Sequence, residues 1–418
     1  MEADTVKSTI DQMKWVNALS TRPSLEAAVA EVTEQAQKLL SLKADLAIVF
    51  ISSTFASEFP RLMPLLKEHL DVPMLIGCGG GGTIGMARSG LAQEVEGKPA
   101  LSLTLAHLPG VEVKTFHIPI DTLPDLDSSP DTWMDLIGVS AAEHPQFILL
   151  SDPFSSNIND LLQGLDFAYP ESIKVGGLAS TGAASNSNGL FCDYQLYREG
   201  TVGVALSGNI VVEAIVAQGC RPIGQLFQVM ESERNILLSL EEHEDNPKAK
   251  PLTPLEALQN LLPTLSESDR ALAQNSLFVG VARNSFKQNL EQGDFLIRVL
   301  LGVDPRNGAI AVGDRIRPGQ RIQFHLRDAQ ASAEDLDMLL QRYQAQERET
   351  SAAGAFMFAC LGRGEGLYGE PDFDSHLFSR YVNQVPIGGF FCNGEIGPVG
   401  DSTFLHGFTT VFGIFRQP

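Results

Sequence analysis

The fold is decided by a stretch close to the end of the chain, VPIGGFFCNGEIGP at residues 385–398, which is followed by FLHGFTT at 404–410. Glycines and prolines interrupt a run of Ile, Phe and Val here. This pattern predicts a buried strand whose backbone then makes close turns that Cβ atoms would obstruct. A carboxylate, an imidazole, a thiol and a hydroxyl lie on the same frame. Polar groups among apolar neighbours on such a backbone are typical of a small-molecule pocket.

Two earlier stretches repeat this arrangement. VPMLIGCGGGGTIG at 72–85 has the same Val-Pro start, apolar strand and closing Gly-x-Ile-Gly, and a shorter copy, IKVGGLASTG, lies at 173–182. The spacing predicts one strand–helix–strand–Gly-turn unit used several times. Each copy follows a buried apolar strand at a similar distance. The interval is 27 positions from Phe50 to Gly77, 27 from Leu149 to Gly176, and 30 from Phe358 to Gly388.

The chain has 418 residues, which is too long for one ordinary hydrophobic core, so we expect two domains, at 1–225 and 226–418. With 44% hydrophobic and 19% charged residues, the composition is that of a globular protein. Strand and helix patterns alternate in some places, and strands follow one another in others. The sequence therefore predicts an α/β class with α+β character, in which two related lobes of mixed β-sheet are flanked by helices.

Charge and hydropathy exclude several classes of partner. The chain has 30 Lys and Arg against 51 Asp and Glu, a net charge of −21, and so acidic a surface repels phosphate backbones and anionic lipids. No apolar run approaches the roughly 18 residues of a membrane span. The start, MEAD, has no basic or apolar signal region. We therefore expect a cytoplasmic protein that binds neither nucleic acid nor membrane.

Cysteine and glycine patterns argue against metal and nucleotide sites. The 5 cysteines are scattered and form no C-x-x-C pair, which predicts buried thiols and neither a disulfide framework nor a zinc site. Gly77–Gly82 satisfies G-x-G-x-x-G, but a dinucleotide site needs a helix to open there. Residues 83–90 instead carry two more glycines and no helical stripe. No cofactor and no metal are predicted.

Local patterns place several elements. Apolar residues recur at intervals of three and four across 25–40, which predicts a helix with one buried face. Residues 253–256, Thr-Pro-Leu-Glu, form a capping box that starts another helix. Two hairpins are expected, one joining 200–206 to 210–216 and one joining 296–302 to 309–312.

Charged residues near the final Gly-rich stretch are candidate ligand contacts. Arg363 lies in a Gly-flanked turn after a buried strand, where it can hold a ligand carboxylate bidentately or form a structural salt bridge to a nearby acid. Glu395 can accept from an amine, act as a general base, or accept backbone N–H groups in its own turn. His406 follows Glu395 closely along the chain and is either a ligand contact or a satisfied core residue.

The thiols allow a different class of function. Cys392 or Cys360 could pair with His406 as a nucleophile of a hydrolase or transferase, although the sequence alone does not place His406 within reach of either sulfur. A lowered thiol pKa would favour this hypothesis. A scaffold that binds only other proteins is a third alternative.

The motifs together resemble those of the FIST family (F-box and intracellular signal transduction proteins). The resemblance to its C-terminal domain rests on CLGRG at 360–364, PIGGFF at 386–391, GEIGP at 394–398 and the final Leu-His-x-x-Thr at 405–409. The stretch 76–85 is similar to the N-terminal domain. The resemblance covers about residue 14 to the end. In the N-terminal copy Thr83 stands where the pattern usually carries Glu, so one carboxylate of a pseudo-symmetric pair is missing.

The resemblance implies a non-enzymatic sensory module that binds a small ligand such as an amino acid or a carboxylate metabolite. Because the sequence carries no kinase, cyclase or F-box segment, we expect a stand-alone sensor that signals through a protein partner or a change in oligomeric state. Arg363 would bind a carboxylate and Glu395 an amine, and backbone N–H groups of two glycines would bind further acceptors. The ligand-binding residues predicted on this basis are Cys360, Arg363, Gly388, Gly389, Cys392, Glu395, His406 and Thr409.

Overall fold

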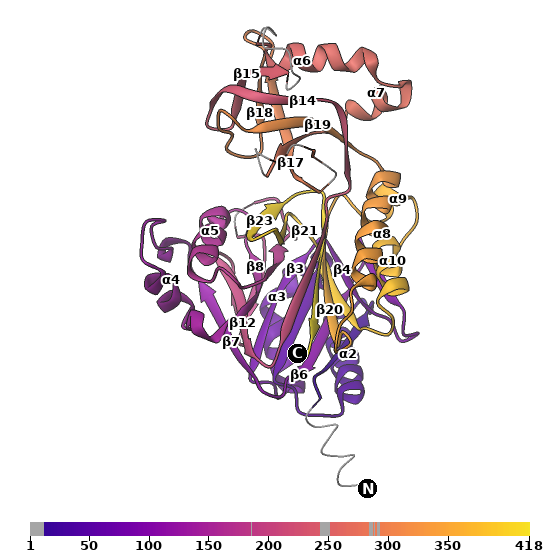
Figure 1. The fold of residues 1–418 in the computed structure, drawn as a ribbon. Helices are drawn as coiled ribbons and strands as arrows, with labels where there is room; N and C mark the ends of the chain where they lie inside the picture. Colours follow the sequence, from indigo (N-terminus) through magenta and orange to yellow (C-terminus); the bar gives the residue numbers. More distant parts are fainter. Residues whose placement is uncertain (1–11, 185, 243–250, 284–286, 288, 291–292) are drawn as a thin grey trace. The chain divides into compact units, whose positions relative to one another are not determined.

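The computed structural model describes residues 12–184, 186–242, 251–283, 287, 289–290 and 293–418. These residues divide into two compact units (Figure 1). The first comprises the described residues of Met1–Val216 and Leu339–Pro418, and the second those of Ala217–Met338. The boundaries of these two compact units differ from those of the domains expected from the sequence, 1–225 and 226–418. The domain boundaries stay a prediction.

The first unit contains three six-stranded mixed sheets. The first sheet has the order β1 (Lys14–Ser20), β6 (Leu101–His107), β2 (Leu46–Ser52), β3 (Met74–Gly80), β10 (Leu190–Cys192) and β11 (Gln195–Tyr197). The second has the order β23 (Ser402–His406), β22 (Glu395–Val399), β9 (Lys174–Leu178), β8 (Gln146–Ser151), β12 (Thr201–Gly208) and β7 (Val111–Ile118). The third has the order β13 (Val211–Ala217), β24 (Thr410–Arg416), β20 (Gly354–Cys360), β21 (Ile387–Cys392), β4 (Gly82–Met86) and β5 (Ala92–Glu96).

Each sheet is built around one parallel pair of strands, and these pairs are the repeats expected from the sequence. The pairs are β2 with β3, β8 with β9, and β20 with β21. Their strands are buried apolar runs, as parallel strands covered on both faces must be. The segments that cross from the first strand of a pair to the second contain α3 (Phe59–His69), α5 (Ile158–Ala168), and α9 (Glu365–Tyr368) with α10 (Phe373–Tyr381), respectively.

A hairpin after each repeat joins the sheet of a different repeat. The β4–β5 hairpin follows β3 but pairs with β21, whereas the β22–β23 hairpin follows β21 and pairs with β9. The β10–β11 hairpin follows β9 and pairs with β3. This cyclic exchange ties the three sheets into one unit, so the repeats do not form one lobe each. The predicted α/β class with mixed sheets flanked by helices is confirmed.

The glycine of each second strand is required by close approach to the first strand. A Cβ atom on Gly176 would lie 1.8 Å from the carbonyl oxygen of Leu149, and one on Gly389 would lie 1.9 Å from that of Met357. Both glycines have φ above +150°, which side chains of L residues rarely adopt. The register therefore equates Gly176 with Gly389, and not with its neighbour Gly388 as the sequence spacing suggested.

Aromatic side chains connect the first sheet to the third. Phe50 of β2 stacks on Phe390 of β21 with ring centroids 5.0 Å apart, and it also meets Phe356 and Phe358 of β20 edge-on. All four side chains are fully buried. Such aromatic contacts between facing sheets supply much of the core's stabilisation, because each ring removes a large apolar area from water.

Helices cover the outer faces of the sheets. The predicted helix at 25–40 is α2 (Leu25–Leu40), whose buried stripe packs on β1 and β6. The helix α4 (Pro130–Ile137) packs on α5, and α10 packs on β5. Short 3-10 turns occupy Ser53–Glu58, Ile120–Thr122, Ala141–Glu143 and Leu262–Thr264. No described helix is long and apolar enough to cross a membrane.

One predicted hairpin is wrong. The strands β12 and β13 are consecutive, but β12 pairs with β7 and β8, and β13 pairs with β24 in a different sheet. Both edges of β12 are thus occupied by other strands, which leaves no edge for β13.

The second unit is a closed barrel with the strand order β14 (Cys220–Glu233), β15 (Ile236–Glu242), β18 (Ala309–Val312), β17 (Phe295–Asp304), β16 (Leu277–Ala282) and β19 (Arg321–Arg327). The predicted hairpin of β17 and β18 is confirmed. The capping box is also confirmed, since Thr253 and Glu256 exchange hydrogen bonds at the start of α6 (Pro254–Leu261). The other helices are α7 (Glu267–Ala273) and α8 (Ala329–Ala345), and the division between the units falls within α8.

Candidate functional site

Most of the predicted site residues meet where β20 and β21 end. Cys360 and Cys392 are the last residues of these two strands and lie directly opposite each other. The backbone N–H of Cys360 donates to the carbonyl oxygen of Thr409 at 3.0 Å, and that of Arg363 donates to the carbonyl oxygen of Cys360 at 2.9 Å. The carboxyl ends of parallel strands are where α/β proteins commonly bind ligands.

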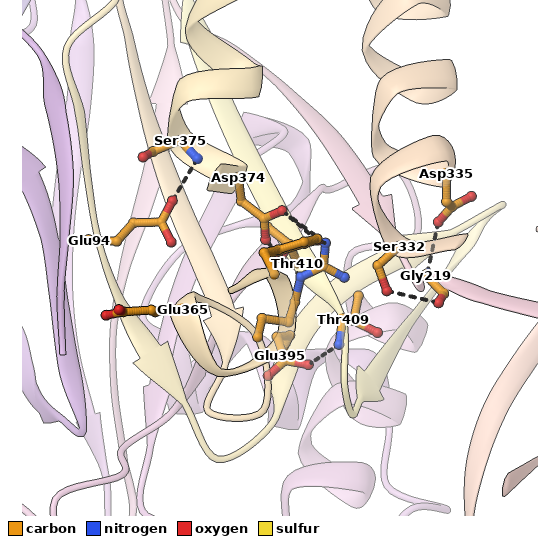
Figure 2. Close-up of polar contacts among 12 residues, drawn as sticks. Glu94, Gly219, Ser332, Asp335, Glu365, Asp374, Ser375, Glu395, Thr409 and Thr410 are labelled. Atoms are coloured by element: carbon orange, nitrogen blue, oxygen red, sulfur yellow. Dashed lines mark hydrogen bonds and ion pairs between the residues drawn. The ribbon is translucent and has the colours of Figure 1, made fainter. Parts of the chain in front are cut away.

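Glu395 and His406 are cross-strand neighbours in the β22–β23 hairpin. One oxygen of Glu395, Oε2, accepts from the backbone N–H of Thr409 at 3.1 Å (Figure 2). The Nε2 atom of His406 lies 3.0 Å from the carbonyl oxygen of Gly397, which can only accept, so Nε2 carries a proton. Glu395 is 0% exposed and His406 3% exposed, so the hairpin presents both side chains to the interior.

Arg363 forms a buried, bidentate ion pair with Asp374 of α10. Its Nε lies 2.7 Å from Oδ2 of Asp374 and its Nη2 lies 3.0 Å from Oδ1, and both side chains are 0% exposed. Tyr368 of α9 accepts from Nη2 of Arg363 and donates to Asp374 Oδ1 at 2.8 Å. Thr410 donates to Asp374 Oδ2 at 2.7 Å. The structural salt bridge considered from the sequence is therefore present.

The donors around Asp374 form a binding site for a carboxylate. A planar guanidinium, a phenol and a threonine hydroxyl all converge on its two oxygens. This is the arrangement that we predicted Arg363 would offer to a ligand, except that the carboxylate belongs to the chain itself. The sequence analysis missed Asp374, Tyr368 and Thr410, because nothing in their local pattern shows which arginine they meet.

The two predicted glycines lie apart from the other residues. Gly388 and Gly389 are inside β21, which pairs with β20 on one side and β4 on the other. A Cβ atom on Gly388 would lie 2.7 Å from Thr104 Oγ1 and 2.8 Å from Asn17 Nδ2. Asn17 itself donates to Thr104 at 2.9 Å. Gly388 thus faces a buried polar cluster between sheets and Gly389 faces the backbone of β20, whereas the other predicted residues gather at the strand ends.

The position of Thr83 in the fold matches that of Glu395. Both residues lie in hairpins that pair with the second strand of a different repeat. Glu395 in β22 lies opposite Gly177 of β9, and Thr83 in β4 lies opposite Phe390 of β21. Thr83 is fully buried, and its hydroxyl has no hydrogen-bond partner among the described residues. The pseudo-symmetric pair expected from the motifs is thus one carboxylate and one hydroxyl.

Glu94 is a second buried carboxyl that the sequence analysis did not single out. It lies on β5 and is 6% exposed, and its Oε1 accepts from the backbone N–H of Ser375 in α10 at 2.7 Å (Figure 2). The backbone N–H of Glu94 donates to Oδ1 of Asp372 at 2.5 Å. Burial, followed by the nearby charge of Asp374, raises the pKa of Glu94 to about 8.

The thiols have the properties of core residues. All five cysteines are buried, as the sequence predicted. Burial raises the pKa of Cys392 well above its ordinary value, and the nearby carboxylate of Glu395 raises it further. A nucleophilic cysteine needs the opposite shift. Among the residues that the structure describes, no group of three or more His, Cys, Asp or Glu side chains could hold a metal ion.

Comparison with known proteins identifies the family. Residues 45–243 match the FIST N domain, and residues 254–398 match the FIST C domain. An uncharacterized protein of Mycobacterium tuberculosis is 31% identical over 398 residues, which cover 95% of this chain and 98% of that protein. An F-box/LRR-repeat protein of Arabidopsis thaliana is 27% identical over 160 residues, or 33% of this chain and 30% of that protein.

Among solved structures, a cyanuric acid hydrolase from A. caulinodans aligns with 97% of this chain and 100% of its own, at 10% identity. Its TM-score of 0.32 is too low to relate the two folds. The domain matches and the full-length relative agree with each other and with the motifs at both Gly-rich stretches. FIST domains are sensory domains of signal transduction, and this chain belongs to the FIST family.

Proposed function

We propose that the protein is a cytoplasmic sensor that binds a small carboxylate metabolite, such as an amino acid, at the ends of β20 and β21. The observation that carries the proposal is the bidentate contact of Arg363 with Asp374, in which a side chain of the protein occupies a ready-made carboxylate site. A ligand carboxylate has the same planar geometry and can take the same donors.

Exchange of one carboxylate for another is energetically feasible at this buried position. Leaving Arg363 without a partner would cost about 3–5 kcal/mol, because an uncompensated charge would remain in the interior. A ligand carboxylate that replaces Asp374 restores the pairing, and the hydration that Asp374 gains offsets the hydration that the ligand loses, so the remaining cost is that of opening the start of α10. Asp374 lies in the first turn of α10, and its release would free that end of the helix. Ligand binding would in this way become a conformational signal to a partner protein.

The remaining candidate residues suit the rest of an amino-acid ligand. Glu395 would pair with the ammonium group, and His406, Thr409, Cys360 and Cys392 would surround it. Glu395 and Thr409 are already in contact, and both have their side chains inside the unit. Because these residues are buried, a ligand reaches them only when part of the surrounding structure moves, and we propose that this is the segment between β20 and β21 that also carries Asp374.

The proposal is tested with a thermal-shift screen of amino acids and dicarboxylic acids such as succinate, after native mass spectrometry for a co-purifying metabolite. In Asp374→Asn the internal competitor is neutral, so a carboxylate that stabilises the wild type should stabilise this variant more. In Arg363→Gln the ligand-dependent shift should disappear.

A matched control separates ligand binding from general loss of stability. Lys174, which is buried, and Asp166, which is partly exposed, form another ion pair, 2.9 Å apart, in the second repeat. Asp166→Asn should lower the baseline melting temperature but leave the ligand-dependent shift unchanged. Equal ligand shifts in wild type, Asp374→Asn and Arg363→Gln would show that the site is elsewhere. The barrel unit then offers a cavity of about 210 Å³ between β14 and α6, with Gln225 and Glu242 in its lining.

A further inference from the structure

Two contacts at one residue hold the start of α10 against the edge of the third sheet. The backbone N–H of Glu94 donates to the side chain of Asp372, which precedes the helix, and the side chain of Glu94 accepts from the N–H of Ser375 in its first turn. β5, which carries Glu94, is the last strand of its sheet. One of the two contacts that attach this helix end to β5 therefore runs through the Glu94 carboxyl group, and the other runs through the Glu94 backbone N–H.

The charges that face Glu94 are predominantly negative. Asp372 and Asp374 both lie at the start of α10, and both oppose ionisation of Glu94. The positive charge nearby, on Arg363, is already bound bidentately by Asp374, and Tyr368 is hydrogen-bonded to the same pair. The second oxygen of Glu94, Oε2, is buried and has no hydrogen-bond partner among the described residues. Protonation of Glu94 removes its negative charge, which no positive group close to it in the described part of the chain neutralises, because Arg363 is paired with Asp374.

We propose that Glu94 is a proton-operated latch: the neutral carboxyl holds the start of α10 on β5, and loss of its proton releases that helix end. This inference goes beyond ligand binding and concerns the ligand-free protein, in which Asp374 pairs with Arg363. Its consequence for the sensor does rest on the proposed function. Because Asp374 lies in the released turn, opening the latch would also loosen the ion pair with Arg363.

The latch has a defined dependence on pH. In the closed state the pKa of Glu94 is raised to about 8, whereas a carboxyl exposed to water by opening returns to an ordinary value of about 4.5. Between these two values the open state binds one proton fewer than the closed state. The equilibrium constant for opening should therefore rise about tenfold for each pH unit, and level off above pH 8.

Hydrogen exchange on the full-length protein tests this directly. The opening constant of the segment 372–381 is measured by mass spectrometry at several values between pH 6 and 8, after correction for the intrinsic exchange rate. We expect the wild type to show a rise of about tenfold per pH unit. The Glu94→Gln variant mimics the neutral carboxyl and should show no rise.

Two further variants test whether the pH dependence belongs to Glu94. Glu96→Gln changes the next glutamate on the same face of β5, whose carboxylate accepts from the N–H of Glu365, and it should retain the wild-type pH dependence. Asp372→Asn removes one opposing charge and should lessen the opening measured at pH 8. A wild-type opening constant that does not change with pH, or one that rises equally in Glu94→Gln, would overturn the latch. Neither result bears on ligand binding at Arg363, which the thermal-shift screen tests separately.

Discussion

The carboxylate of Asp374 binds the Nε–Nη2 edge of the Arg363 guanidinium bidentately, with 2.7 Å from Nε to Oδ2 and 3.0 Å from Nη2 to Oδ1. The pair joins the turn after β20 to the start of α10, and neither side chain reaches the surface. Arg363, which we predicted would bind the carboxylate of a ligand, thus already binds a carboxylate of the chain itself. This relationship makes the pair both a structural element and a candidate point of regulation.

Removing Arg363 should destabilise the first unit strongly. In Arg363→Ala the carboxylate of Asp374 stays buried without its charged partner, and the free energy of unfolding should fall by about 3–5 kcal/mol. The double variant Arg363→Met with Asp374→Leu removes both charges of the pair, so it should be more stable than Arg363→Ala. Urea unfolding followed by fluorescence measures both. A loss of less than about 1 kcal/mol in Arg363→Ala would mean that the pair is hydrated in solution.

The stability of the first unit should fall as pH rises through the range set by Glu94. The folded-state pKa of about 8 lies above the ordinary value of 4.5, so the folded state binds more protons than the unfolded state between these values. Its contribution is therefore complete below pH 4.5 and is lost as pH approaches 8. Urea midpoints measured from pH 5 to pH 8 should decline in the wild type. The decline should be smaller in Glu94→Gln, and an identical decline would assign it to other groups.

The buried thiols should resist alkylation in the native state. Burial raises the pKa of both Cys78 and Cys392 well above the ordinary value, and each side chain is 0% exposed. With iodoacetamide at pH 7.5, peptide mass spectrometry should find both unmodified until urea unfolds the protein. Rapid native alkylation of Cys392 would instead support the alternative hypothesis of a cysteine-dependent hydrolase or transferase.

Gly389 should not tolerate a side chain. A Cβ atom would lie 1.9 Å from the carbonyl oxygen of Met357 in the adjacent strand, and φ is +153°. Gly389→Ala should therefore cost more than about 4 kcal/mol or prevent folding. Gly366 is the matched control, because a Cβ atom there meets nothing within 4 Å. Thermal unfolding of the two variants side by side checks the contrast, and similar melting temperatures would contradict the close approach of the strands.

The sequence alone was sufficient to identify the repeats and several of the elements they contain. Buried apolar strands followed by Gly turns, at nearly constant spacing, predicted the repeated strand–helix–strand units whose strands the structure pairs in parallel at the centre of each sheet. The helix α2 and the capping box at Thr253 were also predicted. These features depend on local patterns, namely hydrophobic periodicity, turn residues and the hydrogen bonds that a helix end requires. The family motifs at both Gly-rich stretches were visible for the same reason.

The tertiary structure decided which strands became neighbours and which side chains met. The sequence suggested a hairpin of β12 and β13 and equated Gly388 with Gly176, because a pattern of alternating residues does not specify the partner strand or its register. Likewise, Arg363 was singled out without Asp374, and Glu94 was not singled out at all. Their contacts bring together residues of β5, α10 and the turn after β20, from separate repeats. Strand pairing and burial are non-local properties, so the closed carboxylate site and the raised pKa of Glu94 arise only when the hairpins have exchanged and the sheets have packed.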